Sequence, residues 1–225
     1  MKCNSKKWRE NLLIITIIIV ILFTNLTGCV QEDLVLDAVE VRNYEGEKLS
    51  SIYDFRENSI KGSQSIDKEN YTLEITGLVK NPKNFTYDEV INDNKVYKKV
   101  VTLDCVEGWR VKILWDGVLV SDLIDKANPL PNAVEVIFHA YDGYTTSLPL
   151  DYIRNKNILM AHKINNVTLP PKRGFPFQLV AESKWGYKWI KWITEIELSD
   201  NDNYRGYWER RGYSDDGNLN ESYFD

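Results

Sequence analysis

The sequence predicts a strand-rich mixed domain of the α+β class, and three observations support this prediction. Segments of alternating apolar and polar residues, such as 71–79 (YTLEITGLV), recur along the chain and are typical of half-buried strands. Only three short segments have the apolar spacing of a helix. Apolar residues make up 43% of the 225 positions, which is enough for a packed core and too much for a disordered chain.

Each predicted element follows from its local pattern. Thr86 is suited to cap a first helix, Asn128 with Pro129 to end a second, and Pro149 to begin a third. Strands are expected where alternation is bounded by turn residues. The predicted strands are 71–79, 95–103, 134–140, 144–148, 158–162, 177–182 and 190–198, and the predicted helices are 87–91, 119–127 and 149–154.

The first 28 residues have the features of an export signal. A basic stretch, 2–9, precedes an apolar run of 12 residues, 12–23, which is shorter than the roughly 20 residues of a transmembrane helix. Residues 26–29 (LTGC) resemble a bacterial lipobox, in which Cys29 becomes the lipidated first residue. The alternative is an uncleaved anchor with an incidental cysteine. Both interpretations place the remaining chain at the extracytoplasmic face of the cell membrane.

Changes in composition divide the chain. We predict a lipoprotein signal peptide over 1–28, a tether and N-terminal arm over 29–69, one domain over 70–214 and a polar tail over 215–225, whose end we expect to be loose. The signal segment carries a net charge of +3, so its removal changes the formal net charge from −5 to about −8. We expect no nucleic-acid partner, because such partners require clustered Lys and Arg.

The three cysteines exclude a disulfide framework, and the two histidines exclude a three-histidine zinc site. Cys3 lies in the signal segment and Cys29 is the predicted lipidation site, which leaves Cys105 alone. A lone thiol in an oxidising compartment is either buried and inert or acts as a ligand or nucleophile. Sequence composition alone leaves both alternatives open.

Several common catalytic motifs are absent from the sequence. It has no G-x-S-x-G hydrolase motif, no Walker loop and no G-x-G-x-x-G dinucleotide motif. It also has no C-x-x-C pair, which excludes a thioredoxin-type site and most iron–sulfur or zinc sites.

Two clusters remain as candidates for chemistry. Residues 105–109 (CVEGW) lie at a predicted strand end, where Gly108 frees the turn. Residues 184–192 (KWGYKWIKW) hold three lysines and three tryptophans, a set that can bind phosphate beside a flat ring system. The alternatives are a small buried cysteine and a solvated strand whose lysines lie over aromatic rings.

These clusters resemble the molybdopterin-binding oxidoreductase family, which contains sulfite oxidases and the catalytic subunit of periplasmic methionine-sulfoxide reductase. The resemblance extends from about Tyr71 to Ser214 and depends on the order and spacing of several motifs. They are C-V-E-G-W, then W-x-G-V-x-x-x-D-L-I, D-G-Y at 142–144, R-G-F-P-F-Q-L-V, K-W-G-Y-K-W-I-K-W and G-Y-W-E-R-R-G-Y-S at 206–214.

The resemblance implies a role for each matching residue. Cys105 would bind molybdenum through its thiolate, a soft ligand suited to this metal. The catalytic candidates are Cys105, Trp109 and Arg110, and the last of these would supply a positive charge. The implied residues for binding molybdenum–molybdopterin are Asn58, His139, Ala140, Arg173, Gln178, Lys188, Trp189, Ile190 and Lys191.

The sequence departs from the family pattern at two of these positions. Gln178 stands where the family usually has an arginine that contacts the cofactor, and Arg173 is a charged residue close enough to compensate. Ala140 lacks a hydroxyl that some family members have. The Lys188–Lys191 pair is expected to hold the pterin phosphate, and Asn58 to reach the pterin from the N-terminal arm.

The resemblance implies an oxidoreductase that transfers an oxygen atom to or from a small substrate. Val-Glu-Gly-Trp after Cys105 favours a neutral substrate such as a sulfoxide over the anion sulfite. No C-x-x-C-H haem motif is present, so electrons are expected from a separate carrier, a cytochrome or a quinol-linked membrane protein. The alternative is a non-catalytic lipoprotein that kept the fold and lost the cofactor.

Overall fold

A computed structural model describes residues 39–224 of the chain. The predicted signal peptide and Cys29 lie outside these residues. From Val41 onward the chain forms one compact unit. Within the described residues, no helix is both long and apolar enough to span a membrane.

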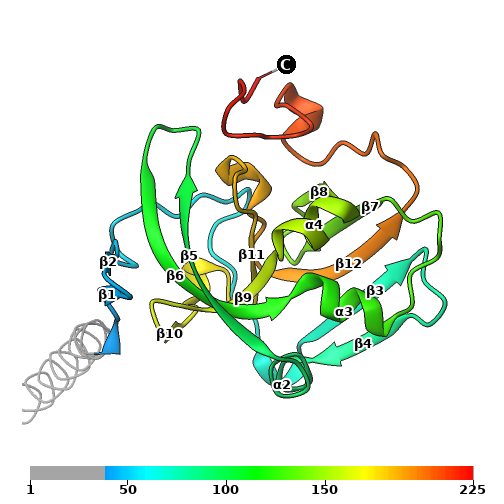
Figure 1. The fold of residues 1–225 in the computed structure, drawn as a ribbon, viewed down its shortest axis with the longest axis horizontal. Coiled ribbons are helices and arrows are strands. Elements are labelled where there is room, and N and C mark those ends of the chain that lie inside the picture. Colours follow the sequence, from blue (N-terminus) through cyan, green and yellow to red (C-terminus); the bar gives the residue numbers. More distant parts are fainter. Residues whose placement is uncertain (1–38, 225) are drawn as a thin grey trace, which may run out of the picture. The chain divides into compact units, whose positions relative to one another are not determined.

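The strands form two five-stranded sheets and one small hairpin (Figure 1). One sheet has the order β10-β9-β6-β5, with β11 paired to β9, and the other has the order β4-β3-β12-β7-β8. The hairpin consists of β1 (Asn43–Tyr44) and β2 (Glu47–Lys48). The bounds of the other strands are β3 Thr72–Gly77, β4 Lys83–Thr86, β5 Val96–Asp104, β6 Arg110–Leu119, β7 Glu135–Ala140, β8 Thr145–Pro149, β9 Leu159–Ile164, β10 Val167–Thr168, β11 Gln178–Val180 and β12 Ile193–Ser199.

Three short α-helices connect the strands, as the sequence predicts. In the first, Thr86 and Glu89 form a capping box, in which Thr86 accepts a hydrogen bond from the Glu89 amide and Glu89 accepts one from the Thr86 amide. The helices are α2 (Tyr87–Asn92), α3 (Val120–Lys126) and α4 (Leu150–Lys156), and the 3-10 turns are η1 (Lys68–Asn70), η2 (Pro171–Arg173), η3 (Gly186–Lys188) and η4 (Glu209–Arg211).

The core lies between the two large sheets and is closed by the helices. Trp115 of β6, Phe138 of β7 and Phe177, which precedes β11, have no exposed surface. Burying aromatic side chains of this size is a large stabilising contribution. The α+β fold class predicted from the sequence is confirmed.

The seven predicted strands are all present, with ends that differ by a few residues. The sequence pattern misses β6, because both faces of this central strand are buried and the alternation is lost. Gly117 lies within β6 where a Cβ atom would come within 2.4 Å of the Met160 carbonyl oxygen on β9. This glycine therefore permits close strand pairing, in a segment whose Asp116-Gly117 pair is more typical of a turn.

Two irregular segments lie beside the β5–β6 hairpin and complete the architecture. The N-terminal arm runs from the β1–β2 hairpin past Asn58 toward η1, and the C-terminal segment follows β12 from Asp200 onward (Figure 1). The polar composition of the C-terminal segment predicts a loose end. The structure instead packs this segment against the domain through bonds such as Tyr207 N–H to Thr145 O, 2.9 Å, and Trp185 N–H to Gly217 O, 2.8 Å.

Candidate active site

Cys105 lies in the tight connection between β5 and β6. Its amide donates to the Trp109 carbonyl over 2.9 Å, and the Gly108 amide donates to the Cys105 carbonyl over 3.0 Å. Gly108 has φ +87°, a conformation that favours glycine. The Cys105 side chain is 7% exposed, and burial raises the pKa of its thiol. The turn therefore holds one thiol at a fixed point beside a cavity.

The cavity has a volume of about 520 Å³, which is within the usual size range of a cofactor or ligand pocket. Five parts of the chain line it: the arm over 55–62, the β5–β6 connection, the β7–β8 turn, segment 172–192 and the C-terminal segment. Asp142 and Tyr144, from the β7–β8 turn, close one side. Residues that are far apart in sequence thus meet around Cys105.

Asn58 reaches Cys105 from the arm, as the family resemblance implies. Its Nδ2 donates to the Cys105 Sγ over 3.6 Å. This hydrogen bond favours the thiolate and opposes the effect of burial on the pKa of Cys105. The arm therefore contributes directly to the environment of the sulfur.

Arg173 holds the arm in place. Its side chain is buried, and its guanidinium donates to the carbonyl oxygens of Ile52 (2.9 Å), Phe55 (2.6 Å) and Arg56 (3.2 Å). The guanidinium also lies 3.6 Å from the centroid of the Phe55 ring. Burial lowers the pKa of Arg173 to about 10, so the group remains a cation at neutral pH. Arg173 lines the pocket, but its bonds are directed mainly to the backbone of the arm.

Lys191 is a second, partly buried cation of the pocket. Its Nζ donates to Glu57 Oε1 over 2.8 Å and lies 4.3 Å from the centroid of the Trp192 ring. The hydrogen bond from Lys191 lowers the pKa of Glu57, although burial alone would raise it. Lys191 is thus placed where the phosphate prediction requires a cation.

Gln178, Trp189 and Ile190 also line the pocket. The Gln178 side chain is 4% exposed, and its side-chain amide group makes no hydrogen bond with the described residues. Gly174 packs beside it with φ +97°, and a Cβ atom there would lie 3.0 Å from the Lys191 side chain. This corner of the pocket therefore has an amide group available for a ligand.

Lys188 is not among the residues that line the pocket, so the structure does not place it where its predicted role as a phosphate ligand requires. Its side chain is 1% exposed, and its Nζ contacts Glu209 Oε1 at 2.7 Å and the Ser147 carbonyl oxygen at 3.1 Å. The 3-10 turn η3 sends Lys188 to the interior, while Lys191 faces the cavity.

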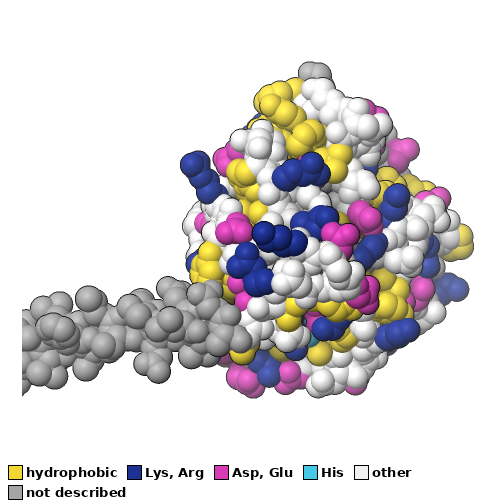
Figure 2. Space-filling view, turned by 60° about the vertical axis from the view of Figure 1, so that its left-hand side comes forward, with side chains coloured by type: hydrophobic (Ala, Val, Ile, Leu, Met, Phe, Trp, Pro, Cys, Tyr) yellow, Lys and Arg dark blue, Asp and Glu magenta, His cyan; other side chains and the backbone are white. Residues whose placement is uncertain are grey.

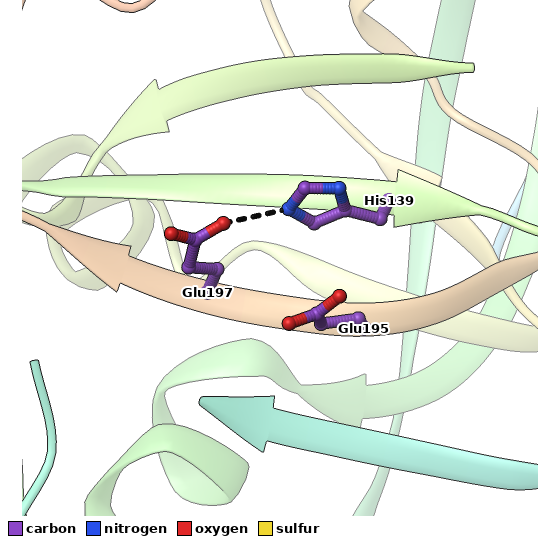
Figure 3. A group of neighbouring side chains, drawn as sticks. All are labelled: His139, Glu195 and Glu197. Atoms are coloured by element: carbon purple, nitrogen blue, oxygen red, sulfur yellow. Dashed lines mark hydrogen bonds and ion pairs between the residues drawn. The ribbon is translucent and has the colours of Figure 1, made fainter. Parts of the chain in front are cut away.

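His139 and Ala140 are also not among the residues that line the pocket, where their predicted role in cofactor binding would place them. Figure 3 shows His139 on β7 beside Glu195 and Glu197 of the neighbouring strand β12, and His139 Nε2 lies 2.8 Å from Glu197 Oε2. In β7 the side chains alternate, so Phe138 and Ala140 are buried while His139 points to the other face.

Arg110 points away from the pocket, contrary to its predicted catalytic role. Its Nε lies 3.0 Å from Asp104 Oδ1, and 72% of its side chain is exposed. Trp109, in contrast, lines the pocket and donates through Nε1 to Glu107 Oε2 over 3.1 Å. Among the residues that follow Cys105, the pocket is thus lined by the ring of Trp109 and the carboxylate of Glu107, and not by the cation of Arg110.

The C-terminal segment supplies two pocket residues that sequence reasoning did not assign, Trp208 and Tyr213. Their rings lie 5.1 Å apart. Burial raises the pKa of Tyr213, and the nearby Cys105 and Glu107 raise it further. The motif G-Y-W-E-R-R-G-Y-S contains both residues, so its aromatic density was the available signal.

Basic and acidic side chains are interleaved on the surface of the molecule. On the face shown in Figure 2, Lys and Arg side chains gather near the centre with Asp and Glu among them. The pocket is lined by four cations, Arg56, Lys172, Arg173 and Lys191. They form a local cluster of positive charge in a chain whose formal net charge is −5.

Comparison with known proteins agrees with this site. A family model described as the oxidoreductase molybdopterin binding domain matches residues 60–208. The chain belongs to the molybdopterin-binding oxidoreductases. The computed structure resembles the sulfane dehydrogenase SoxCD from Paracoccus pantotrophus, with a TM-score of 0.60 and 20% identity over 67% of this chain and 42% of that chain. This likeness shows the sulfite oxidase-type fold.

Three curated relatives of this molybdopterin-binding chain are similar in sequence. The uncharacterized oxidoreductase YuiH of Bacillus subtilis (strain 168) is 34% identical over 65% of this chain and 74% of its own length. The protein-methionine-sulfoxide reductase catalytic subunit MsrP of Gluconobacter oxydans (strain 621H) is 33% identical over 62% of this chain and 50% of its own length. A nitrate reductase (NADPH) of Fusarium oxysporum is 29% identical over 63% of this chain and 19% of its own length.

The pocket fits the cofactor of this family, molybdenum bound to molybdopterin. Cys105 supplies the single thiolate, Asn58 lies beside it, and Lys191 and the Gln178 amide are available for polar groups of the pterin and its phosphate. Gly186 lies close to the backbone at Cys105, where a Cβ atom would come within 3.3 Å of the Asp104 carbonyl oxygen. The donor set and the cavity volume therefore agree with the family cofactor.

Proposed function

We propose that the chain is a lipid-anchored, extracytoplasmic molybdenum–molybdopterin oxidoreductase that reduces a neutral oxo substrate such as a sulfoxide. The observation that carries this proposal is the character of the pocket beside Cys105. The pocket residues that follow it directly in sequence are Val106, Glu107 and Trp109, and none of them is cationic. The similarity to MsrP gives independent support for a sulfoxide.

An anionic substrate such as sulfite or nitrate is less well suited to this pocket. Glu107 lies at the pocket and repels an anion, while Arg110 is paired with Asp104 outside it. Arg173 is bonded to carbonyl oxygen atoms of the arm, and Lys191 is the cation assigned to the phosphate of the cofactor. A neutral sulfoxide avoids the repulsion from Glu107, and its apolar substituents can pack against Trp109 and Trp208.

The cofactor, when bound, supplies two-electron oxygen-atom transfer chemistry. The balanced reaction consumes two protons and two electrons and converts the sulfoxide to a sulfide and water. Tyr213 is suited to hold one proton at its phenol oxygen, because its side chain lines the cavity that holds Cys105 and a phenol is protonated at neutral pH. Cys105 would hold the metal, and the hydrogen bond from Asn58 would keep the sulfur of Cys105 in its orientation.

The electrons would come from a separate carrier, a cytochrome or a quinol-linked membrane protein. The sequence contains no C-x-x-C-H motif that could attach a haem to this chain. Anchoring through Cys29 would hold the enzyme at the membrane where such carriers operate.

The N-terminus of protein isolated from the membrane fraction tests the anchoring part of the proposal. Mass spectrometry should detect a lipid-modified Cys29 as the first residue. A membrane-bound protein that still begins at Met1 would show the uncleaved anchor instead.

Activity of the purified holoenzyme tests the reaction. Methionine sulfoxide and dimethyl sulfoxide should oxidise a reduced viologen dye at rates well above those of the Cys105→Ser variant, which should lack molybdenum by elemental analysis. Oxidation of sulfite with ferricyanide should be much slower. Preference for sulfite, or full molybdenum occupancy in the serine variant, would contradict the proposal.

A further inference from the structure

A buried ion pair connects the C-terminal segment to the interior of the domain. Lys188 Nζ lies 2.7 Å from Glu209 Oε1, and the two side chains are 1% and 0% exposed. Lys188 also donates to the Ser147 carbonyl oxygen, and the Thr146 hydroxyl donates to Glu209 Oε1 over 2.7 Å. The pair thus joins η3, β8 and η4 at one point.

The surroundings of Glu209 leave it little freedom to move. Its Oε2 atom is buried and has no hydrogen-bond partner among the described residues. Gly206 packs against it so closely that a Cβ atom there would lie 2.7 Å from Oε2 and 2.4 Å from the Thr145 carbonyl oxygen. The glycine therefore permits the approach of the segment to β8, and the carboxylate is enclosed at that contact.

Stability alone does not explain such a pair. Removing two charges from water costs several kcal/mol, and well-packed apolar residues often replace a buried ion pair without loss of stability. A buried ion pair instead contributes geometric specificity, because its hydrogen bonds hold the joined segments in one arrangement. The Lys188–Glu209 pair is therefore expected to act by fixing the positions of the residues beside it.

The residues beside Glu209 face the pocket. Trp208 precedes it, and Tyr213 follows the short turn η4, where the Tyr213 amide donates to the Trp208 carbonyl over 3.3 Å. Both side chains line the cavity that holds Cys105, whereas the Glu209 side chain points to the interior. One short turn thus carries an internal anchor and two pocket residues.

We propose that Lys188 and Glu209 are positioning residues that hold Trp208 and Tyr213 as the wall of the substrate pocket. The wall sets which substituents on the substrate fit beside Cys105, so the pair acts on substrate selectivity through the two aromatic rings. Only the kinetic test of this inference rests on the proposed function, because it requires a sulfoxide substrate. The position of the wall itself is measurable without any substrate.

The test compares holoenzymes that differ in this pair. The Lys188→Met/Glu209→Leu variant replaces both charges by apolar side chains, so no unpaired buried charge remains. The matched control is Asp215→Asn, which removes an exposed ion pair with Arg205, 2.8 Å long, within the same segment. A second variant, Glu209→Gln, keeps the size of the side chain and removes only its charge.

Amide hydrogen exchange of residues 206–213 is the first readout, because these amides bond to Thr145 and within η4. We expect exchange to become at least about tenfold faster in the double variant and in Glu209→Gln, which leaves the buried Lys188 unpaired, and to stay unchanged in the control. Molybdopterin content should stay at the wild-type level in all three variants.

Substrate selectivity is the second readout. The ratio of kcat/KM for methyl phenyl sulfoxide to that for dimethyl sulfoxide should fall about tenfold in the double variant, because the phenyl group depends on the aromatic wall. A purely structural defect would lower both values by the same factor. If the wild type reduced no sulfoxide, the proposed function would fail while the exchange experiment still tested the pair.

Two results would overturn the inference. One is unchanged exchange over 206–213 in the double variant, which would show that the wall does not depend on the pair. The other is loss of molybdopterin with unchanged exchange, which would return Lys188 to the role of a cofactor ligand.

Discussion

Replacing Arg173 by methionine tests how the arm is held beside Cys105. Methionine keeps an unbranched side chain of similar length and removes the guanidinium. The structure predicts the loss of three hydrogen bonds to the carbonyl oxygens of Ile52, Phe55 and Arg56, and of the contact with the Phe55 ring. The arm, and Asn58 with it, should then separate from the domain more readily.

The expected loss of stability is about 4 kcal/mol. The buried bond to Ile52 contributes about 2 kcal/mol, as expected for a charged donor, and the two part-buried bonds to Phe55 and Arg56 about 1 kcal/mol each. For a chain of this length, each kcal/mol lowers Tm by about 2–4 °C. Arg173→Met should therefore lower Tm by roughly 10 °C.

Thermal unfolding and molybdopterin content are measured on the same holoenzyme samples. Lys172→Met is the matched control, because this neighbouring cation lies 4.8 Å from the centroid of the Tyr53 ring and makes no ion pair with a described residue. Its Tm should stay within about 2 °C of the wild type. Only Arg173→Met should also lose molybdopterin. Equal Tm values for the two variants would refute the assignment of Arg173 as the anchor of the arm.

Three further predictions follow. Tyr213→Phe should retain molybdenum but lower kcat for a sulfoxide about a hundredfold, because a proton donor is lost; an unchanged kcat would exclude this role. Burial raises the pKa of Glu135 to about 7, so stability should fall by up to about 3 kcal/mol as pH rises from about 4.5 through 7. Glu135→Gln should therefore raise Tm at pH 8 and not at pH 5, whereas parallel profiles would contradict this. Gly174→Ala should cost about 1–2 kcal/mol, measured by urea unfolding, because φ is +97° and the Lys191 side chain must move.

The position of Cys105 could be predicted because it depends on local structure. Strand 95–103 has a clear alternating pattern, and Gly108 marks the turn that follows it. The structure confirms a cysteine at the end of β5 and beside a pocket. Asn58 was placed near the cofactor by resemblance only, since no local pattern relates residue 58 to residue 105.

Strand alternation could have excluded a shared role for His139 and Ala140. Successive side chains of a strand point to opposite faces, so these two neighbours in segment 134–140 cannot both face one ligand. The expectation followed the family's chain path and ignored this alternation. The two-residue repeat of side-chain direction in a strand would have given this result from the sequence alone.

The direction of Lys188 could not be predicted in the same way. Segment 184–192 is neither a regular strand nor a helix, because a 3-10 turn is followed by Trp192 at φ +57°. Spacing therefore does not determine which lysine faces the pocket. The partner that fixes Lys188 is Glu209, 21 residues later in the C-terminal segment that follows β12.

The three sides of the pocket are held by different means, and this explains where the cations are used. Cys105 is held by the paired strands β5 and β6, the arm by Arg173 and the aromatic wall by Lys188. Both of these cations, Arg173 and Lys188, are thus bonded to oxygen atoms of the protein. Lys191 differs from Arg173 because its partner is not a backbone carbonyl but the carboxylate of Glu57, which belongs to the arm and also lines the pocket. An anionic group that binds beside Lys191 must share this cation with Glu57, so cofactor binding and the seating of the arm are thermodynamically coupled.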